Sequence, residues 1–141
     1  MIHFFDASAL VKRYIDEDDS EQVRDWLKRH LVAVSRLSEL EVTSALARRC
    51  REGDFTSADR DRALQMLRRD FESFFVVEIT AEVLQRSRQL LAESPLRAGD
   101  SIQLAAALEL RERLRFPTTF VAFDQRLLDA ARVQELDVLP Q

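Results

Sequence analysis

Short apolar segments rich in β-branched and aromatic residues alternate along this chain with segments of helical periodicity. The apolar runs cover residues 2–5, 32–34, 74–79, 118–123 and 138–139, and helical spacing of apolar residues marks the stretches between them. Strands that alternate with helices in this way form a mostly parallel sheet with helices packed on its faces. The sequence therefore predicts an α/β fold.

The length and composition indicate one globular domain that spans residues 1–141. Hydrophobic residues make up 46% of the chain and charged residues 33%, which is close to the average for globular proteins. No internal repeat, low-complexity tract or Pro/Gly-rich linker divides the sequence. No apolar run approaches a membrane span and no signal peptide is evident, so we expect a cytoplasmic protein without a membrane association.

Several classes of site are excluded because the required residues are scarce. Cys50 is the one cysteine, so neither an internal disulfide nor a Cys-based zinc site can form. The two histidines, His3 and His30, lie far apart in sequence, which argues against a zinc site and a Ser-His-Asp triad. Two glycines cannot supply a Rossmann fingerprint or a P-loop. The net charge of −4 is unlike that of a basic nucleic-acid-binding module. Nearly all the positive charges are arginines, however, and their guanidinium groups pair well with phosphate.

Four acidic residues stand where the predicted fold would bring them together. Asp6 directly follows the first predicted strand, and Asp124 follows the strand at residues 118–123. In parallel sheets, ligands bind beyond the carboxyl ends of the strands, so these two carboxylates are expected at one edge. Asp100 opens a very apolar helix, and Glu41 lies on or beside the apolar stripe of the helix at residues 37–51.

Each of these acids also has a structural interpretation. Asp6, Asp100 and Asp124 each precede helix-forming sequence and could serve as helix N-caps, a role that does not prevent metal binding. Glu41 could instead form a salt bridge with Arg36, Arg48 or another arginine. A carboxylate near the core is costly unless it is paired or bound to a cation, so both interpretations of Glu41 supply a partner.

A group of carboxylates at one edge favours a divalent cation, because a bound ion removes their mutual repulsion. Mg²⁺ and Mn²⁺ prefer oxygen ligands, which this chain supplies in place of nitrogen or thiolate. Such an ion activates water as a nucleophile and offsets charge that grows on a phosphate. Phosphodiester hydrolysis by this route requires no Cys, Ser or His nucleophile.

At four segments the sequence resembles the PIN domain family, and specifically the VapC-type ribonuclease toxins of type II toxin–antitoxin pairs. The segments are Phe4 to Leu10 with an Asp-x-Ser motif, Val34 to Val42 with a glutamate, Leu96 to Ala105 with the third acid, and Phe120 to Leu127 with the fourth. The resemblance implies a three-layer α/β/α sandwich and a Mg²⁺- or Mn²⁺-dependent endoribonuclease. It also implies a VapB-like antitoxin as partner, an RNA substrate and a homodimer.

By the same resemblance, four acids would form the catalytic metal centre, with Ser8 in a supporting role. Basic residues near the acidic motifs in sequence are candidates for contacts with RNA phosphate. The four acids are Asp6, Glu41, Asp100 and Asp124, and the basic candidates are Lys12, Arg97 and Arg126.

Two departures from the family pattern and two alternative functions remain at this point. Gln103 stands where many relatives carry histidine, and Glu135 occupies a turn where glycine is common. The main alternative is a non-catalytic PIN-like module that binds RNA or protein. A phosphoryl-aspartate protein is disfavoured, because Ser8 stands where a phosphatase would want a second aspartate and no lysine follows Lys28.

Overall fold

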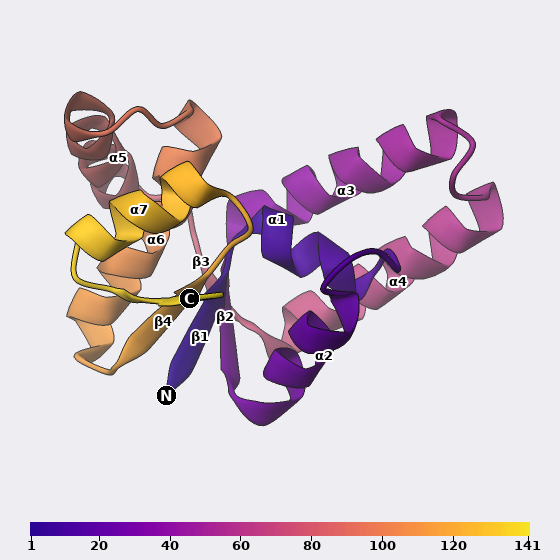
Figure 1. Ribbon diagram of the computed structural model, residues 1–141, viewed down its shortest axis with the longest axis horizontal. Coiled ribbons are helices and arrows are strands. Elements are labelled where there is room, and N and C mark those ends of the chain that lie inside the picture. Colours follow the sequence, from indigo (N-terminus) through magenta and orange to yellow (C-terminus); the bar gives the residue numbers. More distant parts are fainter.

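The computed structural model describes all residues from Met1 to Gln141 and is built around one parallel sheet. Every pairing between neighbouring strands is parallel, in the order β3-β2-β1-β4-β5 (Figure 1). The first strand of the chain therefore lies at the centre, and the α/β prediction is confirmed. The strands are β1 (Ile2–Phe5), β2 (Leu31–Ser35), β3 (Phe75–Val77), β4 (Thr118–Val121) and β5 (Asp137–Leu139).

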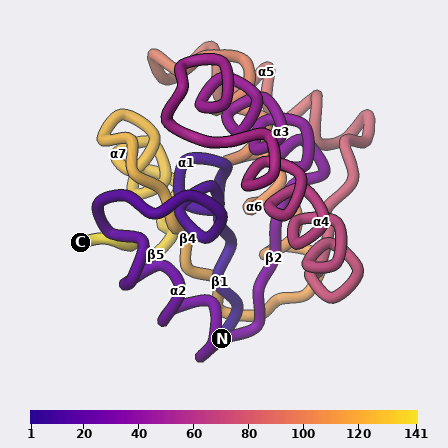
Figure 2. Tube along the Cα trace, turned by 90° about the vertical axis from the view of Figure 1, so that its right-hand side faces the viewer, coloured from indigo at the N-terminus to yellow at the C-terminus, as the bar shows by residue number.

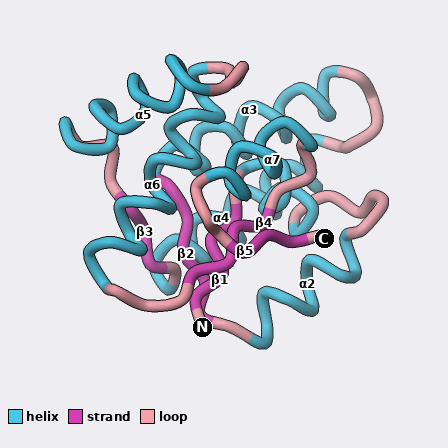
Figure 3. Tube along the Cα trace, turned by 60° about the vertical axis from the view of Figure 1, so that its left-hand side comes forward, coloured by secondary structure: helices cyan, strands magenta, loops and turns pink.

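Helices cover both faces of this sheet and complete the predicted three-layer sandwich (Figures 1 and 3). One face carries the short elements after β1 and the next three helices, and the other face carries the last three helices. No helix combines the length and the apolar character that crossing a membrane requires. The first group is α1 (Ala7–Leu10), the 3-10 turn η1 (Val11–Arg13), α2 (Ser20–Arg29), α3 (Arg36–Arg51) and α4 (Ser57–Ser73); the second is α5 (Ala81–Glu93), α6 (Ala98–Leu114) and α7 (Gln125–Val133).

The alternation of side chains along β1 divides the core into two clusters. Phe4 points into the cluster beneath α5, α6 and α7, where its ring stacks on Phe120 of β4 at 5.8 Å between centroids. Phe5 points to the opposite face and packs with Leu10, Val34 and neighbours from α2, α3 and α4. Both phenylalanines are fully buried. A central strand with apolar residues on both faces is typical of a parallel sheet enclosed between helices.

Two predicted strands are shorter than their apolar runs. The run at residues 118–123 forms a strand only over Thr118–Val121, and two residues later the Phe123 backbone N–H donates to Ser8 Oγ at 3.0 Å. The run at residues 74–79 pairs only over Phe75–Val77, and the chain then reaches Thr80, which caps α5. The apolar pattern thus predicts each strand but not the residue at which the strand ends.

Two other local features differ from the sequence interpretation or explain it. Apolar spacing of Val23, Trp26, Leu27 and Leu31 would extend the second helix to Leu31, but α2 ends at Arg29 and Leu31 begins β2, where 66% of its surface is exposed. Extended backbone at His30 makes this break. Glu135 adopts a φ of 60°, in the left-handed region that favours glycine, which accounts for the preference for glycine in that turn.

Helices α3 and α4 form an antiparallel hairpin that projects from the body of the molecule (Figures 1 and 2). A partly buried polar cluster fixes α4 of this hairpin to η1 and the residue after it. Arg13 donates to both carboxylate oxygens of Asp70 at 2.6 and 3.1 Å, and the Tyr14 hydroxyl donates to the same carboxylate at 2.6 Å. Burial and the Asp70 carboxylate raise the pKa of Tyr14 well above its usual range, so the hydroxyl remains a donor.

We expect Asp70→Asn to lower the free energy of unfolding by about 1–3 kcal/mol, because it removes the charge of a partly buried, bidentate ion pair and leaves Arg13 and Tyr14 one acceptor oxygen in place of two. Urea denaturation followed by circular dichroism measures the change. Asp25→Asn is the matched control, since its ion pair with Arg29 lies on the exposed surface of α2. The control should cost less than about 0.5 kcal/mol, and equal losses in the two variants would contradict a structural role for the Asp70 cluster.

Candidate active site at the carboxyl ends of the strands

Asp6 and Asp124 emerge from neighbouring strands at the same edge of the sheet. Phe5 of β1 is in register with Val121 of β4, and the Asp6 backbone N–H donates to the Val121 carbonyl at 3.0 Å. Asp6 therefore follows β1 at the level where β4 ends, and Asp124 opens α7 three residues after Val121. The expectation that these two acids share one sheet edge is confirmed.

The carboxylate of Asp6 is buried and held in a fixed orientation. Only 3% of the residue is exposed, and its Oδ1 accepts hydrogen bonds from Ser8 Oγ at 2.7 Å and from the Ala9 backbone N–H at 3.0 Å. The second bond makes Asp6 the N-cap of α1, as its structural interpretation predicted. Ser8 Oγ in turn accepts from the Phe123 backbone N–H, so this hydroxyl joins the ends of β1 and β4.

Burial raises the pKa of Asp6 from its ordinary value to about 7. The hydrogen bonds from Ser8 and Ala9 oppose this shift, whereas the charges of Asp100 and Glu41 add to it. No lysine or arginine forms an ion pair with Asp6. The buried carboxylate therefore lies among other carboxylates without a protein cation to neutralise it.

Asp100 and Asp124 form the second half of this acidic group. Burial and the charge of Asp124 raise the pKa of Asp100, and Arg97 partly offsets the rise. Asp124 is the N-cap of α7, and its Oδ1 accepts from the backbone N–H groups of Arg126 at 2.9 Å and Leu127 at 3.3 Å. The capping interpretation is wrong for Asp100, which lies inside the first turn of α6, where Arg97 occupies the N-cap position.

Glu41 reaches the same region from α3 and is held by an amide rather than by an arginine. Its Oε1 accepts a hydrogen bond of 2.8 Å from Nε2 of Gln103, which also donates to Ser38 Oγ at 2.9 Å. The alternative of a salt bridge is therefore wrong: Arg36 pairs with Glu78 and Glu39, and Arg48 forms no ion pair.

Gln103 and Gly99 of α6 lie against Glu41, although neither is among the predicted site residues. Gln103 is 1% exposed, and its amide links α6 to Ser38 and Glu41 of α3. Gly99 lies so close to Glu41 that a Cβ at this position would be 3.2 Å from Glu41 Oε2. The available signal for Gln103 was a polar residue in the apolar run at residues 102–110, which is interrupted elsewhere only by Glu109, because a buried amide requires hydrogen-bond partners.

The donor set of this site suits a hard divalent cation. Each predicted ligand offers carboxylate oxygen, and the raised pKa values of Asp6 and Asp100 record an electrostatic cost that a bound cation would remove. No three acidic, histidine or cysteine side chains converge closely enough to hold an ion as they stand. The chemistry of the donors therefore fits Mg²⁺ or Mn²⁺, while ligation would require side-chain adjustment.

The basic residues predicted to contact RNA phosphate differ in their availability. Lys12 donates to Glu17 Oε1 at 3.3 Å and to the Asp18 carbonyl at 2.9 Å, and its ammonium lies 4.8 Å from the centre of the Phe123 ring. Arg97 and Arg126 are exposed and form no ion pair. A phosphate contact stays a prediction for all of them, and for Lys12 it would compete with existing bonds.

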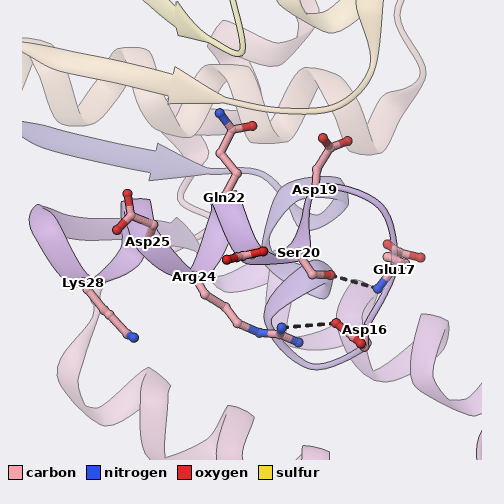
Figure 4. A pocket seen from close by; sticks show the side chains of 9 residues that line it. Asp16, Glu17, Asp19, Ser20, Gln22, Arg24, Asp25 and Lys28 are labelled. Carbon is pink, nitrogen blue, oxygen red and sulfur yellow. Dashed lines mark hydrogen bonds and ion pairs between the residues drawn. The ribbon is translucent and has the colours of Figure 1, made fainter.

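A separate polar pocket of about 810 Å³ lies along α2 and the loop before it (Figure 4). It contains none of the predicted site residues. Two contacts lie within it: Arg24 donates to Asp16 at 3.2 Å, and Ser20 Oγ accepts from the Glu17 backbone N–H at 3.0 Å. This surface is therefore distinct from the acidic group at the sheet edge.

The raised pKa of Asp6 predicts how stability depends on pH when no divalent ion is present. A carboxyl group whose pKa rises on folding binds its proton more tightly in the folded state, so the stabilisation from protonated Asp6 is fully present below about pH 4 and is lost as pH rises through about 7. Asp6→Asn removes this loss, and we expect it to be about 2–4 kcal/mol more stable than the wild type at pH 8 in EDTA.

Denaturant unfolding in EDTA at several pH values between 4 and 8 measures this difference. Asp54→Asn is the control, because Asp54 is exposed and its carboxylate has no hydrogen-bond partner. The control should follow the wild-type profile. A wild-type protein that gains stability between pH 4 and 7 relative to Asp6→Asn would contradict the electrostatic description of the site.

Comparison with known proteins agrees with this arrangement of fold and acidic residues. The PIN domain family model matches residues 3–133. Ribonuclease VapC45 and Ribonuclease VapC49, from two strains of Mycobacterium tuberculosis, are each 34% identical over 143 aligned positions, which cover 97% of this chain and 94% of each relative.

Solved structures show the same fold at lower sequence identity. Mycobacterium tuberculosis VapC20, described as a sarcin-ricin loop cleaving toxin, superposes with a TM-score of 0.68 at 17% identity and covers 91% of this chain and 94% of its own. VapBC2 from Rickettsia felis, bound to a DNA fragment from its promoter, gives a TM-score of 0.67 at 14% identity over 98% of this chain and 97% of that chain. The match across residues 3–133, the parallel sheet and the relatives at 34% identity together show that this chain belongs to the PIN domain family.

Proposed function

We propose that this chain is an endoribonuclease that hydrolyses RNA phosphodiester bonds and acts as the toxin of a toxin–antitoxin pair. The observation that carries the proposal is a group of four acids at one sheet edge that are close enough to interact. The charges of Asp100 and Glu41 raise the pKa of Asp6, and the charge of Asp124 raises the pKa of Asp100. The relationship to proteins named VapC ribonucleases over nearly the whole chain supports the same activity.

We further propose that activity requires Mg²⁺ or Mn²⁺, held by Asp6, Glu41, Asp100 and Asp124. When bound, such an ion supplies positive charge against the phosphate and lowers the pKa of water. The support for this proposal is the all-oxygen donor set and the lack of a protein cation beside Asp6.

The residues around these acids have defined tasks in the proposed reaction. Ser8 orients the Asp6 carboxylate through its hydroxyl, and Gln103 orients Glu41 through its amide. A water molecule attacks phosphorus in line with the leaving oxygen, and a new bond forms between water oxygen and phosphorus. The old phosphorus–oxygen bond breaks, and the leaving oxygen keeps its electron pair and takes a proton from solvent to become a hydroxyl group. An ionised carboxylate of the group accepts the proton that water releases.

Partners follow from the same proposal. Several related structures are toxin–antitoxin assemblies, among them one from Klebsiella pneumoniae and VapBC from Salmonella typhimurium bound to DNA. These likenesses support a VapB-like antitoxin as a partner of this chain. A homodimer, an RNA substrate and a cytoplasmic location complete the proposal as predictions from the sequence.

The alternative is a PIN-like module that binds RNA or protein without cleaving it. An incomplete set of acids would favour this alternative. Here all four acids are present, and neighbouring side chains donate hydrogen bonds to two of them. Cleavage measured directly separates the two functions.

The proposed function is tested by incubating purified protein, freed of antitoxin, with total RNA and a panel of defined RNAs in Mg²⁺, Mn²⁺ or EDTA. We expect discrete cleavage products with either metal and none in EDTA. Asp100→Asn should lower the cleavage rate at least about 100-fold, because it removes a predicted ligand while the half-buried position tolerates the isosteric amide.

Asp54→Asn is the activity control, since it makes the same chemical change on a remote exposed residue. Circular dichroism confirms that each variant is folded. Equal cleavage by the wild type and Asp100→Asn would show that the acidic group is not the active site. Metal-independent cleavage by the wild type would overturn the requirement for a divalent ion, and RNA binding without cleavage would favour the non-catalytic module.

A further inference from the structure

A groove leads away from the acidic group between α1 and α3. It has a volume of about 470 Å³ and is lined at one end by Ser8 and Glu41, which belong to the candidate site. Its walls are formed by small and apolar side chains, and its remaining polar lining residues are Ser44 and Arg48 of α3. The groove is therefore continuous with the site and carries one basic side chain.

The position of Arg48 follows from helix geometry. Glu41, Ser44, Ala45 and Arg48 are spaced by three, four and seven residues, so they share one face of α3. Seven residues of α helix advance by about 10 Å, which corresponds to one or two nucleotides along an extended strand. A strand whose scissile phosphate lay at Glu41 would thus bring a neighbouring phosphate to Arg48.

Arg48 is also free to bind an anion. Of the three arginines in the last turn of α3, Arg49 forms an ion pair with Glu17, whereas Arg48 is exposed and forms no ion pair or side-chain hydrogen bond. Basic residues in the last turn of a helix commonly offset the helix dipole, and the three arginines of α3 can do so. That role does not require any of them to line a groove. The guanidinium presents paired N–H donors that match phosphate oxygens.

We propose that Arg48 forms a phosphate subsite, which holds the RNA backbone one or two nucleotides away from the cleaved bond. This inference rests on the proposed function and deepens it by assigning the path of the substrate. Arg48 acts as a positioning residue: it contacts a phosphate that does not react, so it contributes to binding rather than to the chemical step. The sequence pattern had assigned phosphate contacts to Lys12, Arg97 and Arg126 instead.

The test compares Arg48→Gln with Arg88→Gln in a background that cannot cleave. Arg88 lies on the exposed side of α5, on the other face of the sheet, and forms no ion pair, so its change matches the loss of charge (Figure 1). Binding of a fluorescent mixed-sequence RNA pool to each Asp100→Asn double variant is measured by anisotropy between 50 and 200 mM salt, a range chosen because phosphate contacts are strongly salt-dependent.

We expect Arg48→Gln to weaken binding about 5- to 20-fold at the lower salt concentration and to reduce the salt slope by about 0.7, the amount for one phosphate contact with a single strand. Arg88→Gln should leave both quantities unchanged. Arg48→Lys should retain the salt slope, because it keeps the charge, while losing part of the affinity. In cleavage-competent protein, Arg48→Gln should raise KM and leave kcat unchanged.

The outcomes separate this inference from the proposed function. If the Asp100→Asn parent binds RNA and Arg48→Gln behaves like Arg88→Gln, the phosphate subsite is wrong while the nuclease proposal stands. A fall in kcat with KM unchanged would also overturn the subsite, since it would place Arg48 in the chemical step. If the parent binds no RNA at all, both the subsite and the proposed function fail.

Discussion

The burial of Asp6 among other carboxylates is the constraint on which the site depends. A carboxylate removed from water favours its neutral form unless a cation compensates, and here the nearby charges of Asp100 and Glu41 increase the cost. The fold accepts this cost at the junction of β1 and β4, the centre of the sheet. Placing repelling charges at such a rigid position is characteristic of functional sites, because stability alone would favour an apolar residue there.

The surrounding structure fixes these acids without neutralising them. Neutral donors hold both ends of the group: the Ser8 hydroxyl bonds Asp6, and the Gln103 amide bonds Glu41. Arg13 is engaged elsewhere, in the pair with Asp70 that fixes α4 of the projecting hairpin, and Arg97 offsets the charge at Asp100 only in part. The site therefore keeps its orientation while its negative charge stays available to an external cation. The groove toward Arg48 offers a path for the negatively charged backbone of an RNA strand.

Much of the fold and part of the site could be predicted from local sequence patterns. Apolar runs predicted each strand, and the register of β1 with β4 confirms that Asp6 and Asp124 share one edge. Contacts between distant segments could not be predicted in this way. Gln103 and Glu41 are 62 residues apart, and the bond between them depends on how α6 packs against α3. The N-terminus of α6 was misplaced for a local reason, since Arg97 at the N-cap position makes no capping hydrogen bond with its side chain that would mark the start of the helix.

A titration of Mn²⁺ into metal-free protein, followed by the thermal unfolding midpoint, tests the central claim most directly. The account predicts a saturable rise in Tm for the wild type at pH 8, because the ion binds the folded state and relieves the repulsion. Asp100→Asn should show little or no rise, while Asp54→Asn should match the wild type. An equal rise in Asp100→Asn and the wild type, or no rise in the wild type at millimolar Mn²⁺, would contradict a cation site built from these carboxylates.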